Sequence, residues 1–243
     1  MRLASLLRVA AILLLCAPAA ASASASAATP AALPGIGTDA VRTMLILSML
    51  AVVPAILISM TSFIRIVVVL SMVRHAFGMP ETPPNPVLVS LALFLTAFTM
   101  SPTFSAVNGE ALQPLLGGRI TVEQAVERGS RPLRDFMLAQ TRDADIEAIY
   151  AIAKTPVPDR PEQVEILKLA PAFMLNELRV AFTIGFVVLL PFLLIDLVVA
   201  SILLALGMMM VPPATISLPI KILMFVLIDG WGLILQGVLG SFR

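Results

Sequence analysis

The chain has 243 residues, of which 59% are hydrophobic and 13% are charged, and its mean hydropathy is +1.00. These values lie outside the range of soluble globular proteins and indicate a membrane protein or a subunit of a membrane assembly. The net charge is +1 and falls to −1 without Arg2 and Arg8, so no nucleic-acid-binding surface is indicated. One cysteine, Cys16, and one histidine, His75, supply almost no ligands for a zinc or haem site, and we expect no metal and no cofactor.

Residues 1–25 are predicted to be a secretory signal peptide. Arg2 and Arg8 precede the apolar run Val9–Ala17, and the small residues that follow offer A-x-A cleavage sites. The alternative is an uncleaved anchor helix, although the run is short for a membrane span. Residues 26–38 are rich in Ala, Pro, Gly and Ser, and we expect a flexible linker there.

Residues 39–102 are predicted to form an N-terminal hydrophobic helical hairpin. The apolar run Thr43–Ile64 is interrupted near Pro54, and the run Ile66–Val73 follows it. A proline-rich elbow, Gly78–Pro86, forbids helix and leads into a third apolar segment, Val87–Met100. The basic residues between the elbow and the first run are predicted to face the cytoplasm.

Residues 103–168 differ in composition from the rest of the chain. More than half of all charged residues lie here, ten acidic and eight basic. Thr121–Arg128 and Arg131–Arg142 have the pattern of short amphipathic helices, and Asp143–Ala153 has acidic residues suited to a helix N-terminus. We expect a small helical domain on the extracytoplasmic side.

Residues 169–243 are predicted to form a C-terminal hydrophobic hairpin. Its segments Val180–Leu206 and Ala214–Ile228 are long and apolar, and Gly207 with Pro212-Pro213 turns the chain between them. The turn carries three methionines, Met208, Met209 and Met210, where a solvent-facing membrane loop is normally polar. Flexible methionines suit a seal that yields and closes again, and the alternative is an ordinary hairpin tip buried in a subunit contact.

Six charges interrupt apolar segments, and each needs a partner or water. They are Arg65, Glu177, Arg179, Asp196, Lys221 and Asp229. Asp196 and Asp229 fall at nearly equal depth in the hairpin and either share a proton or take basic partners such as Arg65; structural pairing is favoured. Glu177 and Lys221 are expected to pair but are offset by about 39 Å along one straight hairpin. Either Pro191 folds the first arm back or the two pair between neighbouring copies, and we favour neighbouring copies.

No enzyme motif is present. The chain contains no G-x-S-x-G, HExxH, Walker A or dinucleotide-binding glycine pattern, so we predict no catalytic residues and no enzyme activity. His75 stands beside Arg74 and is interpreted as an interfacial residue rather than a base.

Three motifs together resemble the FliP/SctR family of type III secretion export-gate subunits, and the signal peptide resembles the flagellar FliP branch. They are Met60–Arg74 with the elbow Thr82–Pro86, Leu206–Ala214, and Leu218–Lys221 with Asp229–Trp231. The resemblance implies an all-α protein of membrane-associated helical hairpins, in a homo-oligomer with FliQ- and FliR-type membrane subunits.

The same resemblance implies a place and a role. The assembly would lie in lipid of the bacterial inner membrane, at the flagellar basal body, and pass unfolded flagellar export substrates. Met208, Met209 and Met210 would form a gasket across its pore. The alternative function is a small-solute or ion transporter that uses Asp196, Asp229 and Lys221.

Overall fold

The computed structural model describes residues 38–78, 82–158 and 160–242, and every regular element within these ranges is a helix. The all-α fold class is thus confirmed for this part of the chain. The predicted signal peptide and residues 26–37 of the predicted linker lie outside the described residues. The chain divides into two compact units, Met1–Ile46 and Leu47–Arg243, and of the first only the opening turns of α2 are described.

The N-terminal apolar region forms three helices: α2 (Thr38–Ser59), α3 (Phe63–Ala76) and α4 (Asn85–Thr99). The break expected near Pro54 is wrong, because α2 continues through that residue. The helix ends instead at Ser59. Two residues later, the Thr61 hydroxyl donates to the Ile58 carbonyl at 2.8 Å and accepts the Phe63 N–H at 3.4 Å. A side chain that satisfies backbone groups in this way competes with the helix ladder.

The charged region begins with α5 (Ser101–Val107), the π-helical turn η1 (Asn108–Leu112) and α6 (Gln113–Leu116), and α7 (Val122–Gln140) packs back against them. Thr121 and Gln124 close a capping box at the start of α7. The two helices expected between Thr121 and Arg142 are one helix, because Pro132 removes a single hydrogen bond on a helix that packing already holds. The third expected helix is confirmed as α8 (Asp143–Ile152).

The charged region shares a core with the start of the C-terminal hairpin. After the 3-10 turn η2 (Pro161–Gln163), the chain enters α9 (Ile166–Ala205), and α7 and α8 pack against it. This lower core contains Met137, Ile146, Tyr150, Val164, Leu169, Ala172 and Phe173. The last three of these residues lie beyond residue 168. The predicted domain boundary at 168 therefore divides a hydrophobic cluster, and the domain itself stays a prediction.

The C-terminal hairpin turns where the sequence predicts. The 40-residue helix α9 runs through Pro171 and Pro191 without stopping, and the chain reverses between Gly207, at φ +72°, and Pro212. The return arm is α10 (Pro213–Leu227) followed by α11 (Gly230–Leu239), which meet at a bend of 66°. The helix expected over Ala214–Ile228 is thus confirmed as α10, and α11 continues the arm beyond the bend.

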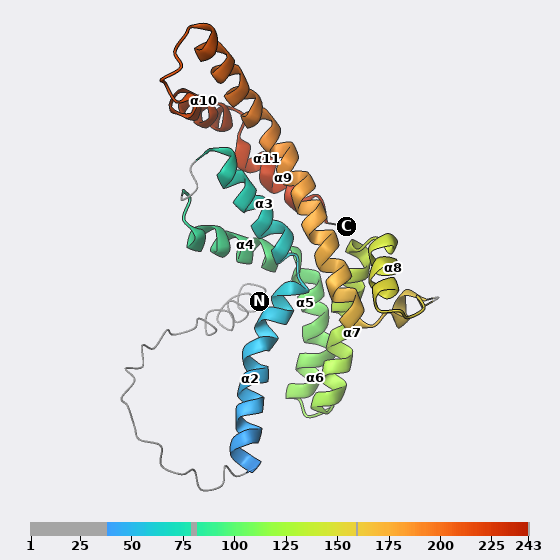
Figure 1. The fold of residues 1–243 in the computed structure, drawn as a ribbon. Coiled ribbons are helices and arrows are strands. Elements are labelled where there is room, and N and C mark those ends of the chain that lie inside the picture. Colours follow the sequence, from blue (N-terminus) through green and yellow to red (C-terminus); the bar gives the residue numbers. More distant parts are fainter. Residues whose placement is uncertain (1–37, 79–81, 159, 243) are drawn as a thin grey trace, which may run out of the picture. The chain divides into compact units, whose positions relative to one another are not determined.

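Helix α3 lies alongside the middle of α9, and α4, α10 and α11 complete the packing around it (Figure 1). The upper core is made of Ile66, Val69, Leu70, Val73, Ala76, Phe77, Leu88, Ala92, Ala181, Phe192, Phe225, Ile234 and Val238. A Cβ placed on Gly185 of α9 would lie 2.3 Å from the Met72 Sδ of α3. A side chain at this position would force Met72 to move, so glycine allows the close approach of the two helices without a rearrangement.

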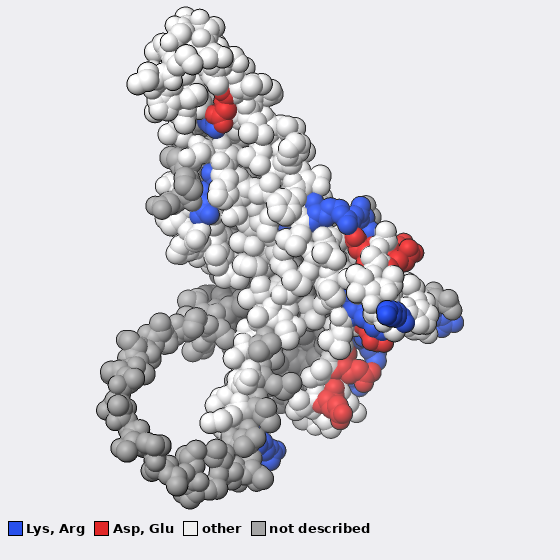
Figure 2. Space-filling model, viewed as in Figure 1, with Lys and Arg blue, Asp and Glu red and all other residues white. Residues whose placement is uncertain are grey.

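One helix in the described ranges, α9, is long and apolar enough to cross a membrane by itself. Two bent pairs reach the same standard only when each is counted as one span: α4 with Ser101–Leu116, bent by 64°, and α10 with α11. Figure 2 shows that charged side chains gather over α6, α7 and α8, whereas the surface over the upper part of α9 and α10 is almost free of charge. We call α3, α4, α10, α11 and the part of α9 that packs with them the apolar half. Its exposed apolar surface requires apolar neighbours outside this single chain.

The close approach at Gly185 predicts an asymmetry between two glycine substitutions. Gly185→Ala should lower the free energy of unfolding by about 1–3 kcal/mol, as overpacking does, and Met72→Ala in the same chain should restore part of the loss. Gly237 of α11 has open space around its Cα, so Gly237→Ala should not destabilise the protein. The midpoint of thermal unfolding in detergent measures the stability of each variant. Equal midpoints for Gly185→Ala and Gly237→Ala would contradict the packing argument.

The shared lower core predicts how two fragments differ. A fragment of residues 103–168 should be helical by circular dichroism but only marginally stable, because it lacks Leu169, Ala172 and Phe173. A fragment of residues 101–180 contains the whole cluster and should unfold at a higher temperature. A strand-rich spectrum would overturn the helical assignment, and identical stabilities would show that α9 contributes nothing to this core.

Candidate functional site

The central feature of the site is the buried guanidinium of Arg65, in the first turn of α3. Its side chain is 1% exposed, and that of its partner Glu177 in α9 is 0% exposed. Nε donates to Glu177 Oε2 at 2.9 Å, and Nη2 donates to Glu177 Oε1 as well. Nη1 donates to both the carbonyl and the hydroxyl of Ser241 at 2.9 Å, and Nη2 also reaches Gln140 Oε1 at 3.4 Å.

Every nitrogen of this guanidinium therefore has an acceptor. The guanidinium carbon lies 3.9 Å from the centre of the Phe242 ring, a distance suited to a cation–π contact. We call Arg65, Gln140, Glu177, Ser241 and Phe242 the arginine hub. A buried ion pair is stable only when its remaining hydrogen-bonding groups are satisfied. The hub meets that condition with groups from α3, the end of α7, α9 and the C-terminal segment.

Helical spacing explains why Glu177 points inward. Phe173, Glu177, Ala181 and Gly185 are four residues apart along α9, and all four are buried. Arg65 has the same relation to Val69 on α3. Both charges thus lie on the faces that the two helices press together, and they meet there.

Lys221 is the second buried charge, and it lies in α10. Its Nζ donates to Asp196 Oδ2 of α9 at 2.6 Å and to the Ala76 carbonyl at the end of α3 at 3.2 Å. The lysine is 6% exposed and the aspartate 42% exposed. A cation at a helix C-terminus is also favoured by the helix dipole. Lys221 therefore joins three helices.

These two ion pairs correct one expectation. The argument that Glu177 and Lys221 must pair between copies assumed that neither has a partner in its own chain, and that assumption is wrong. Glu177 is bound by Arg65 and Lys221 by Asp196. The partners come from α3 and from a different position along α9.

Arg179 has a partner as well. Its Nη1 lies 2.8 Å from the carboxylate of Asp145 in α8, which Arg142 also contacts at 3.3 Å. This pair attaches the charged region to α9. The sequence identified Arg179 as a charge in need of a partner but gave no reason to choose Asp145.

Asp229 lies at the bend between α10 and α11, with φ +50° and ψ +55°. Its carboxylate is exposed, and it makes no hydrogen bond or ion pair with the part of the chain that the structure describes. Asp196 and Asp229 are not bonded to each other, and Asp196 takes a basic partner instead. Of the charges within apolar segments, Asp229 is thus the one without a partner among the described residues.

The methionine turn is uncovered at the far end of the hairpin. Met208 is 43% exposed, Met209 82% and Met210 95%. The segment from Gly207 to Pro212 that holds them carries no charge. Three flexible apolar side chains are thus presented outward, where water alone would be an unfavourable neighbour.

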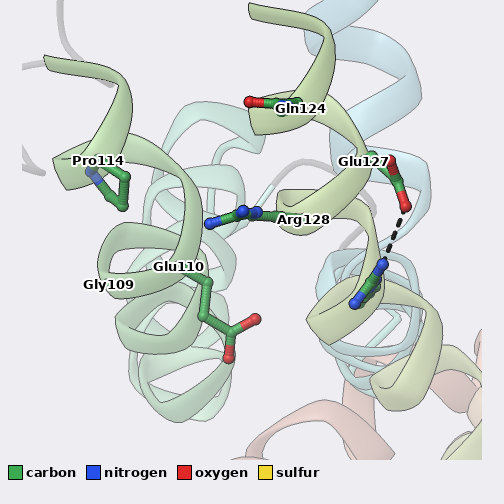
Figure 3. A pocket seen from close by; sticks show the side chains of 7 residues that line it. Gly109, Glu110, Pro114, Gln124, Glu127 and Arg128 are labelled. Carbon is green, nitrogen blue, oxygen red and sulfur yellow. Dashed lines mark hydrogen bonds and ion pairs between the residues drawn. The ribbon is translucent and has the colours of Figure 1, made fainter. Parts of the chain in front are cut away.

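A groove of about 490 Å³ lies between the η1–α6 arm and α7 (Figure 3). Arg128 projects from α7 toward Glu110, and Glu127 pairs with Arg131 at 2.9 Å. Its charged side chains are exposed, and the groove holds no arrangement that suits catalysis. No group of three metal-binding side chains occurs among the described residues.

Four residues of the site were missed by sequence reasoning. They are Gln140, Asn176, Ser241 and Phe242, and Asn176 supports the hub by donating from Nδ2 to the Gln140 carbonyl at 2.5 Å. A buried arginine requires several acceptors, so the need for such residues was predictable. No pattern identifies them, because each is an ordinary residue at a helix end or on a helix face.

The residues that form these contacts lie in a region that matches a known protein family. The FliP family model matches residues 46–238, which hold α3 to α10, both ion pairs and the methionine turn. This chain belongs to the FliP family.

Several relatives of this FliP-family chain are described as flagellar biosynthetic protein FliP. That of Pectobacterium carotovorum subsp. carotovorum is 53% identical over 205 residues, covering 84% of this chain and 80% of that protein. Those of Bacillus subtilis (strain 168) and Aquifex aeolicus (strain VF5) are 47% and 46% identical over 205 and 207 residues. These two alignments cover 84% of this chain in each case, and 93% and 87% of the relatives.

The arginine hub predicts a large loss of stability when one partner is removed. Glu177→Gln should lower the free energy of unfolding by about 3–5 kcal/mol, because it leaves a buried guanidinium unpaired. Arg65→Lys should also destabilise the protein, since lysine cannot supply donors to Glu177, Gln140 and Ser241 together. Thermal unfolding of the purified chain measures the change.

The control for this prediction is the exposed pair of Glu127 and Arg131, whose side chains are 69% and 61% exposed. Glu127→Gln should have little effect, as surface ion pairs contribute little. A Glu177→Gln variant that unfolds at the same temperature as Glu127→Gln would refute the structural role of the hub.

Proposed function

We propose that this FliP-family chain is a core subunit of the flagellar type III protein export gate. Copies of it, together with FliQ- and FliR-type membrane subunits, enclose a closed pore in the bacterial inner membrane at the flagellar basal body. Unfolded flagellar export substrates pass through that pore when it opens. The chain has no catalytic role, and residues 103–168 lie on the extracytoplasmic side.

The exposed methionine turn carries this proposal. A hairpin tip without charge, with Met209 and Met210 almost fully exposed, requires an apolar neighbour. Identical tips from several copies are one such neighbour, and methionine side chains can repack as they separate and close again. The tips would then form a gasket across the pore.

The length of the apolar face of α9 supports an assembly over a single chain in lipid. Large exposed hydrophobic side chains run from Leu175 to Leu206, which is about 46 Å of helix at 1.5 Å per residue. The hydrocarbon core of a bilayer is only about 30 Å thick. Lipid alone therefore cannot cover this face, and protein subunits are the remaining cover.

The ion pairs favour a gate over a small-solute or ion transporter. A transporter that uses Asp196, Lys221 and Asp229 needs groups free to bind or release an ion. Lys221 is held by Asp196 and by the Ala76 carbonyl, which suits a structural role. Co-purification separates the two functions, since the gate requires a stable complex with other small membrane proteins and the transporter does not.

The gasket predicts a leak. Replacing Met208, Met209 and Met210 together by Ala should leave the complex intact, because the helices on either side are unchanged, and should let ions or small solutes pass. Conductance of the reconstituted complex measures the leak. The matched control replaces the three methionines by Leu, which keeps the apolar volume and should remain closed. Wild-type conductance in a normally assembled alanine variant would disprove the gasket.

A further inference from the structure

The bend between α10 and α11 presents a carboxylate within an apolar surface. Val226 is 69% exposed, Leu227 74% and Leu233 55%, and Asp229 lies among them. We call these four residues the bend surface. Asp229 has a left-handed backbone, a conformation that aspartate tolerates better than most residues. At this place the chain bends by 66° between α10 and α11, and each of these side chains is exposed.

The carboxylate of Asp229 is only partly accommodated by its own chain. A Cβ on Gly232 would lie 2.3 Å from Asp229 Oδ2, so the carboxylate rests over the first turn of α11. The helix dipole favours a negative charge there, yet no side-chain capping bond forms. When the surrounding apolar side chains are covered, this carboxylate loses its water and needs a cation.

Arg74, in the last turn of α3, has donors to spare. Its half-exposed guanidinium donates to Asn85 Oδ1 and makes no ion pair with the residues that the structure describes. Arg65 and Lys221, the other basic residues of α3 and α10, are fully engaged by their own chain. Among the described arginines and lysines of α3 and α10, Arg74 is therefore the one that makes no ion pair with a carboxylate.

Contacts within the chain place Arg74 and Asp229 at the same level along α9. Phe77, one turn after Arg74, lies 4.8 Å from Phe225 between ring centres, and Phe225 lies 5.5 Å from Trp231. Asp229 stands between Phe225 and Trp231 in the sequence. Copies that stand side by side with parallel α9 helices would therefore bring these two charges to one height.

We propose that Asp229 of one copy forms an ion pair with Arg74 of the adjacent copy, and that the bend surface is a contact between copies of this chain. Each copy supplies one cation and one anion, so a head-to-tail contact repeats around a ring without leaving a charge unpaired. This inference rests on the proposed assembly of several copies. Lipid or a different subunit on the bend surface are the competing outcomes.

Cross-linking between two tagged versions of the full chain tests the contact. Both versions carry Cys16→Ser, which removes the only native cysteine. One carries His75→Cys and the other Leu227→Cys, at exposed residues beside Arg74 and Asp229, so that both charges stay in place. The two are expressed in one cell, and the detergent-extracted complex is treated with a short bismaleimide. We expect a dimer that carries both tags. As a matched control, Glu147→Cys in the exposed face of α8 should give no dimer with Leu227→Cys.

The outcomes separate this inference from the proposed function. If the two tags co-purify and no mixed dimer forms, or if Leu227→Cys links only to another protein, the ion pair is overturned and the assembly stands. If the tags do not co-purify, both are overturned.

Exchanging the charges of Asp229 and Arg74 is a second, independent test of the ion pair. Asp229→Asn keeps a residue that tolerates the left-handed backbone, so a loss of assembly with this variant reflects the charge. Asp229→Lys and Arg74→Glu alone should each lower the amount of recovered complex about a hundredfold, as loss of one partner of a buried pair does. The double variant should recover most of that loss. A double variant that assembles no better than either single variant would overturn the pair.

Discussion

The arrangement of the described helices depends on the hydrogen bonds of one buried side chain, that of Arg65. The guanidinium of Arg65 is removed from water in the first turn of α3, and a charge in that position is stable only when every donor is bonded. Its acceptors lie 75, 112 and 176 residues further along the chain, in Gln140, Glu177 and Ser241. One side chain thus fixes the end of α7, the middle of α9 and the C-terminal segment against α3. The hydrophobic cores on either side hold these elements together, but their side chains are not directional and do not select this arrangement by themselves.

Three ion pairs attach other elements to α9 at successive positions. Asp145 of α8 binds Arg179, Arg65 of α3 binds Glu177, and Lys221 of α10 binds Asp196. Beyond Asp196, no further side-chain ion pair holds the hairpin within the described chain, and its tip carries the exposed methionine turn. A firmly held base with an adaptable apolar tip is the mechanical property that a protein-conducting gate requires, since the base must keep its place while the tip yields.

The distribution of apolar surface explains why a single copy is incomplete. The charged region has its own water-compatible surface, whereas the face of α9 and the return arm expose leucine, valine and phenylalanine over a length greater than a bilayer core. Such a surface is stable only beside lipid and other subunits together. The unpaired carboxylate at the bend has the same implication, because a charge in an apolar surface requires a partner from outside the chain.

The sequence by itself determined the features that depend on neighbouring residues. It predicted the helical class, the turn between Gly207 and Pro212, and the start of α8, because turn chemistry, capping and hydrophobic period act over a few residues. It also identified Arg65, Glu177, Asp196 and Lys221 as charges in need of partners. The tertiary structure alone decided which of them pair, since several residues of suitable charge were available and only packing sets which helices meet. The helix through Pro132, the bend before α11 and the acceptors at Gln140 and Ser241 were decided in the same way, by contacts between segments distant in sequence.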